Sequence, residues 1–92
     1  MIDVKRTSDG DPMEFDVVVR KDGGETRHQV SLERAVAQRL GDAHAPEQIV
    51  EAAFRFLLDR EPKESILGHF DLTVISRYFP DFEARLPEYL RL

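Results

Sequence analysis

Apolar residues recur at every second position in one short stretch near the start of the chain. Phe15, Val17 and Val19 share one face there, with Asp16, Val18 and Arg20 on the other. A period of two in β-branched and aromatic residues is typical of a half-buried strand. The following Asp22-Gly23 dipeptide is a strong signal for a tight hairpin turn, because a type I′ turn needs positive φ at both central residues.

The sequence therefore predicts a returning strand from Glu25 to about Ser31. A two-residue turn fixes its register, which pairs Val19 with Thr26, Val17 with His28, and Phe15 with Val30. In this register Arg27 and Gln29 face solvent. A four-residue loop that included Gly24 would change the pairing.

After the hairpin the apolar spacing becomes helical. Ser31 is suited to cap a short helix from Leu32 that stops at Gly41, and Pro46 to Arg60 reads as the central core helix, ended by Pro62. The remaining elements are a short helical turn within Lys63 to Phe70, a helix over Leu72 to Phe79 capped by Asp71, and an amphipathic stretch from Phe82 to the end that Pro87 interrupts.

These elements predict a single α+β domain over residues 13–92, with an N-terminal β-hairpin packed against three to five short helices. Residues 1–12 are polar and rich in turn formers, so they are predicted to be a flexible arm. The predicted core consists of Phe15, Val17, Val30, Val36, Leu40, Ile49, Ala53, Phe54, Leu57, Leu72 and Ile75.

Composition narrows the class of protein. Of the 92 residues, 41% are hydrophobic and 34% are charged, as in ordinary folded domains. The absence of cysteine excludes disulfides, thiolate metal sites and a cysteine nucleophile. Neither a signal peptide nor an apolar run long enough to cross a membrane is found, so a small soluble, bacterial-type protein of the cytoplasm is expected.

Charge is unevenly distributed along the chain. The net charge is −5, and only residues 20–41 are basic, at +2. An acidic whole argues against strong nonspecific binding to nucleic acid, which depends on neutralising phosphates. Nucleic acid is thus a less favoured partner than protein.

The usual chemical motifs are missing. His28, His44 and His69 do not follow a metal-binding spacing, no phosphate-binding glycine motif occurs, and the serines lack a nucleophile context. We therefore expect no enzyme activity, no metal and no cofactor. His69 beside Asp71 is the one pair that could place an imidazole near a carboxylate, although Asp71 is better explained as a helix cap. His28 is expected on the apolar face, satisfied by a neighbour.

The aromatic residues near the C-terminus have two interpretations. They can complete the core, or the spacing of Ile75, Phe79, Phe82 and Leu86 can form an exposed apolar stripe that docks on a partner protein or on a second copy of the chain. Small domains often associate in this way. The stripe makes a noncatalytic protein-interaction module, which could also be a homodimer, the leading hypothesis.

An alternative comes from the order strand, Ser31-Leu32, short helix, Gly41 and then Pro46 to Leu58. Residues 26–60 resemble the ribbon-helix-helix family of transcriptional regulators and antitoxins. The resemblance implies a dimer whose paired strands enter the major groove of DNA, with Arg27, Gln29 and Ser31 as base readers and a phosphate contact at residues 45–47. It also implies that residues 64–92 bind a toxin.

Overall fold

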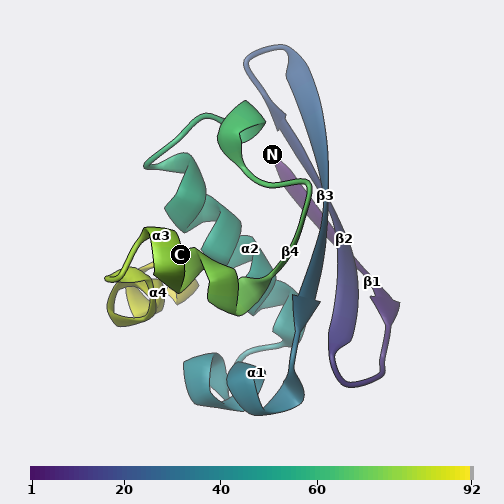
Figure 1. Cartoon of the computed structure of the whole chain (residues 1–92), viewed down its shortest axis with the longest axis vertical. Coiled ribbons are helices and arrows are strands. Elements are labelled where there is room, and N and C mark those ends of the chain that lie inside the picture. Colours follow the sequence, from purple (N-terminus) through teal and green to yellow (C-terminus); the bar gives the residue numbers. More distant parts are fainter. Residues whose placement is uncertain (92) are drawn as a thin grey trace.

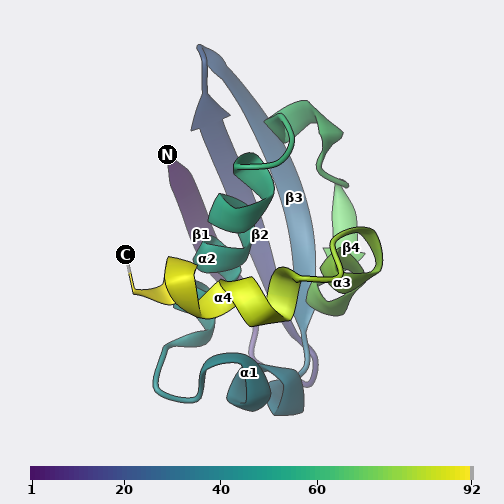
Figure 2. The same ribbon diagram turned by 90° about the vertical axis from the view of Figure 1, so that its left-hand side faces the viewer.

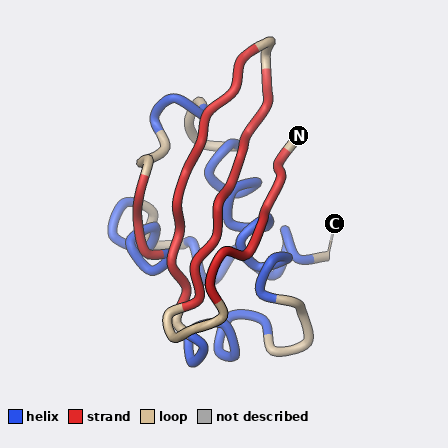
Figure 3. Tube along the Cα trace, turned by 90° about the vertical axis from the view of Figure 1, so that its right-hand side faces the viewer, coloured by secondary structure: helices blue, strands red, loops and turns tan. Residues whose placement is uncertain are grey.

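Four strands form one sheet in the order β1-β2-β3-β4 in the computed structural model, which describes residues 1–91. The strands are β1 (Ile2–Ser8), β2 (Met13–Lys21), β3 (Gly24–Leu32) and β4 (His69–Asp71). The first three are antiparallel, and β4 runs parallel to β3. Figure 3 shows the sheet from its open side, with all helices behind it.

The helices lie against the other side of the sheet (Figure 1). Helix α2 crosses the sheet and α4 lies over α2, as Figure 2 shows. The helical elements are α1 (Arg34–Gly41), α2 (Pro46–Leu58), the 3₁₀ turns η1 (Lys63–Ser65) and η2 (Leu72–Val74), α3 (Ile75–Tyr78) and α4 (Phe82–Leu90). The fold is thus a single α+β domain, as predicted. No helix within residues 1–91 combines the length and the apolar character that crossing a bilayer demands.

The β2–β3 hairpin has the predicted register. Val19 pairs with Thr26, Val17 with His28, and Phe15 with Val30. Asp22 and Gly23 form the turn with φ values of 57° and 77°, as a type I′ turn requires.

The predicted flexible arm is wrong for residues 2–8, which form the edge strand β1. Ile2, Val4 and Arg6 alternate toward the helices. Arg6 takes an inward position that an apolar residue would normally hold. Its guanidinium donates two hydrogen bonds to Glu47 of α2, at 2.8 and 2.7 Å, and one to Asp9 at 2.8 Å. A partner 41 positions away therefore secures the strand.

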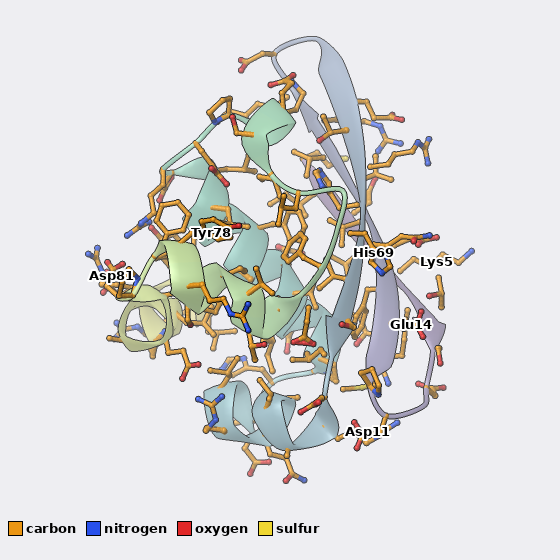
Figure 4. All side chains as sticks on the ribbon, in the orientation of Figure 1. Lys5, Asp11, Glu14, His69, Tyr78 and Asp81 are labelled. Atoms are coloured by element: carbon orange, nitrogen blue, oxygen red, sulfur yellow. The ribbon has the colours of Figure 1, made fainter. Side chains whose placement is uncertain are left out.

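Several predicted element boundaries also differ from the structure: α2 ends at Leu58, and the helix predicted over Leu72 to Phe79 is divided into η2 and α3. Ser31 and Leu32 belong to β3, and α1 starts at Arg34 after Glu33. The amide N–H of Arg34 donates to Asp11 Oδ1 at 3.0 Å, so a side chain from the β1–β2 loop caps the helix (Figure 4). Within Lys63 to Phe70 only η1 is helical, because the chain then extends into β4.

The core lies between the sheet and α2. All predicted core residues are buried except Leu40, which packs against the core half-buried. His28 is buried as predicted: its Nδ1–H donates to the carbonyl oxygen of Leu67 at 2.7 Å, and its Nε2 lies 2.8 Å from Thr26 Oγ1. Its ring packs against Phe54, with 5.3 Å between ring centroids.

Candidate functional site: an apolar groove

A groove of about 320 Å³ opens between the C-terminal end of α2, the chain that follows it, and α3. Its walls are mainly apolar, and they combine Leu57, Glu61, Ser65, Ile66, Leu67, Phe70, Val74, Ile75, Tyr78 and Phe79. A concave apolar surface with few polar groups is the usual form of a binding site.

Local sequence explains how the groove forms. Pro62 cannot continue α2, and η1 turns the chain back toward the sheet. The segment then runs along β3, where the carbonyl oxygen of Gly68 accepts from the amide of Gln29 at 2.8 Å. The bond between His28 and the Leu67 carbonyl fixes the same segment. This wall of the groove is thus tied to the central hairpin.

Two large apolar side chains of the lining are unusually exposed. Leu67 is 48% exposed and Tyr78 is 67% exposed. Tyr78 projects from α3 on the helical side of the molecule in Figure 4. Both side chains remain available to cover apolar surface on another molecule.

Glu61 contributes the carboxylate of the lining. Burial among apolar neighbours raises the pKa of its carboxyl. Among residues 1–91 no salt bridge or side-chain hydrogen bond compensates this carboxylate. Within the described residues the groove therefore carries a partly desolvated carboxylate that has no salt-bridge partner.

Most of the predicted apolar stripe is buried. Phe79 is half-buried and lines the groove; Ile75 also borders the groove but is a buried core residue, and Phe82 and Leu86 have no exposed surface. The ring of Phe56 packs edge-on against Phe82, with 5.1 Å between the ring centroids. The prediction of an exposed stripe through Phe82 and Leu86 is therefore wrong, because α4 turns both residues into the core.

The predicted base readers all lie on the open face of β3. Arg27 pairs with Glu25 at 2.8 Å, and the Ser31 hydroxyl donates to Asp71 Oδ1 at 2.9 Å. Gln29 stands between Asp16 of β2 and His69 of β4. β3 is paired with β2 along its length, and β4 covers its other edge only from Gln29 to Ser31, so two of the three predicted base readers lie where β3 is paired on both sides.

His69 and Asp71 share the open face of β4, but no hydrogen bond joins them in the described structure. Asp71 accepts from the Thr73 amide at 3.2 Å and from its hydroxyl at 2.8 Å, as expected of a cap. Figure 4 shows His69, Lys5 and Glu14 on the sheet side, away from Tyr78. In residues 1–91 no three histidine or acidic side chains are arranged to hold a metal ion.

Sequence reasoning missed the combination of Glu61, Leu67 and Tyr78. Glu61 precedes a helix-ending proline, and the residues four positions away on either side, Leu57 and Ser65, offer no positive charge. A carboxylate without a basic neighbour at helical spacing was the signal available.

Comparison of the chain with protein-family models, with curated proteins and with solved structures gave no significant match.

Proposed function

We propose that this protein is a noncatalytic interaction module, and that its apolar groove binds a short segment of another protein. The segment would carry one or two large apolar side chains and one lysine or arginine. The apolar side chains would cover Leu67 and Tyr78, and the cation would face Glu61.

The uncompensated carboxylate of Glu61 carries this proposal. A charge that is partly removed from water without a partner costs free energy, and a cation brought by a ligand offsets that cost. The groove volume of about 320 Å³ lies at the small end of ligand-binding sites. This size suits a few side chains of a peptide better than a large cofactor.

The exposed apolar side chains give the second support. Leu67 and Tyr78 belong to different walls, yet both border the same groove. Binding energy at interfaces is concentrated in aromatic and other large side chains that fill such hollows.

Selection from a library of displayed random peptides tests the proposal. The enriched peptides should combine apolar residues with a lysine or arginine, and NMR shift changes should map to the groove. Glu61→Lys and Tyr78→Ala should each weaken the selected peptides at least tenfold. Glu14→Gln, on the open face of the sheet, is the matched control and should bind normally. Peptides that bind all four proteins equally would contradict the proposal.

The ribbon-helix-helix alternative remains a prediction. It requires a dimer and loss of operator binding when Arg27 is replaced by alanine. None of the described contacts of Arg27, Gln29 or Ser31 favours it over the groove.

A further inference from the structure

The outer edge of β1 is a free edge of the sheet. β1 has seven residues and pairs with β2 on one side only. In Figure 3 it is the strand at the edge marked by the N-terminus, and no strand lies beyond it. An edge of this length exposes unpaired backbone groups that can pair with another strand.

The phase of the ladder shows which backbone groups are free. The Met1 amine donates to the Arg20 carbonyl at 2.7 Å, and the Arg20 amide donates to the Met1 carbonyl at 2.8 Å. In an antiparallel ladder such reciprocally bonded pairs alternate with pairs that share no bond. Residues 1, 3 and 5 therefore turn their backbone groups toward β2, and Ile2, Val4 and Arg6 turn theirs outward.

We propose that two copies of this protein associate through β1, in an antiparallel pair centred on Val4. In this register Val4 of each copy bonds reciprocally with Val4 of the other, and Ile2 bonds with Arg6. All outward backbone groups from Ile2 to Arg6 then find partners. The two four-stranded sheets join into one sheet of eight strands.

Charge complementarity selects this register. With Val4 at the centre, Asp3 of one copy lies opposite Lys5 of the other, twice. These are pairs without backbone bonds, in which the side chains approach most closely. Centring the pair on Asp3 or Lys5 would set like charges opposite each other. It would also place at the centre of the interface a residue whose backbone groups already bond to β2.

The same two side chains are accessible in the single chain. Lys5 is exposed, projects from the sheet on its open side (Figure 4), and forms no salt bridge within the described residues. Asp3 is also exposed and contacts Arg20 on β2. The second copy would thus supply Lys5 with a carboxylate partner and add a cation beside Asp3.

Hydrogen exchange of single amides, measured by NMR on the full chain over a dilution series, is the first test. The amides of Asp3 and Lys5 bond to β2 and should be protected at every concentration. The amides of Val4 and Arg6 should be protected only where light scattering gives twice the monomer mass of 10.6 kDa. In mixed labelled and unlabelled protein, an intermolecular contact between the Hα atoms of Asp3 and Lys5 should appear.

Val4→Pro should abolish association while leaving the monomer folded. Its nitrogen faces away from β2, so proline removes a donor only from the seam, and continued protection of Asp3 and Lys5 would show that β1 is intact. If proline disturbs β1, a charge-reversal pair tests the proposed register instead. Lys5→Glu should weaken association, and adding Asp3→Lys to that variant should restore it. Tyr78→Ala is the control for association through the groove and should leave the dimer unchanged.

Three results would overturn the proposal. They are a monomer at the highest attainable concentration with unprotected Val4 and Arg6 amides, a dimer that Val4→Pro leaves intact while β1 stays folded, and a charge-reversal pair that fails to restore association.

Discussion

Two glutamates at opposite ends of α2 experience contrasting environments. Glu47, in the first turn, accepts two hydrogen bonds from Arg6, which lower the pKa of its carboxyl. Glu61, just beyond the helix, lies among apolar side chains that raise the pKa of its carboxyl. The first carboxylate holds β1 to the helix, whereas the second has no salt-bridge partner within residues 1–91.

Glu47→Gln should lower the free energy of unfolding at neutral pH by about 0.5 kcal/mol, since the pair is partly exposed and screened by water. Because the folded-state pKa of Glu47 is lowered, its contribution is present above the ordinary carboxyl pKa and is lost as pH falls through the folded-state value. Urea unfolding between about pH 7 and pH 3 should show the difference between wild type and variant shrinking with acidification. Glu14→Gln, which breaks no ion pair within residues 1–91, is the control substitution, and a constant difference for Glu47→Gln across this pH range would contradict the assignment.

Glu61→Gln should change the free energy of unfolding at neutral pH in the opposite direction. A raised folded-state pKa means that the contribution of the group is most favourable below its ordinary pKa and is lost as pH rises through the folded-state value. The variant should therefore be as stable as wild type at neutral pH or more stable, by up to about 0.5 kcal/mol, with the difference vanishing in acid. Thermal melts check this. A clear loss of stability at neutral pH would mean that Glu61 has a structural partner.

Single residues were predictable from sequence where their partners are near in the chain or lie directly across the hairpin. The burial of His28 followed from its position opposite Val17, and the capping role of Asp71 followed from the residues after it. The pairing of Arg6 with Glu47 joins residues 41 positions apart. The local sequence around either residue does not predict such a contact.

Among the elements, the β2–β3 hairpin depends most directly on its local sequence. Its turn places Asp22 and Gly23 at positive φ, a conformation that disfavours residues with a Cβ. The remaining strands of the sheet depend on contacts from elsewhere in the chain.

Gly23→Ala should destabilise the protein by about 1 kcal/mol, because alanine is strained at positive φ. Gly68→Ala is the matched control: its φ lies outside the positive region, and an added Cβ there meets no atom within 4 Å. The control should be neutral, or slightly stabilising through the unfolded chain. Equal melting temperatures for the two variants would contradict this account of the turn.

The elements whose bounds the sequence failed to predict are those stabilised by side chains far away in the chain. β1 contains only two apolar residues, Ile2 and Val4, so its alternation was too weak to outweigh the polar loop beside it. Helix α1 lacks a cap from its own flanking residue and takes one from Asp11. In both cases the stabilising group belongs to another element.

At the scale of the whole molecule, β1 is part of the folded unit. It covers one edge of β2, and Ile2 and Val4 pack against the core. The class of fold was predictable because hairpin and helical periodicities are strong. The groove was not, because it exists only once the chain after α2 has turned back along β3.

Deleting residues 2–8 tests this role of β1. The deletion removes the β1 ladder, the Arg6–Glu47 pair and the packing of Ile2 and Val4 against the core, so it should cost several kcal/mol, on the order of the whole stability of a small domain. Circular dichroism melts should show a much lower transition or none. Unchanged melting would mean that residues 2–8 are an arm after all.

The two edges of the sheet are unequal. At the edge opposite β1, β4 offers only three residues from His69 to Asp71, and within residues 1–91 β3 continues that edge from residue 24 to residue 28 without a strand beside it. β1, with seven residues, is thus the longest single stretch of edge strand in the sheet. Pairing through β1 about a two-fold axis uses the same edge in both copies, so this contact closes at two copies. Such a pair would hold two apolar grooves in one particle, so a partner with two matching segments could bind both and gain avidity.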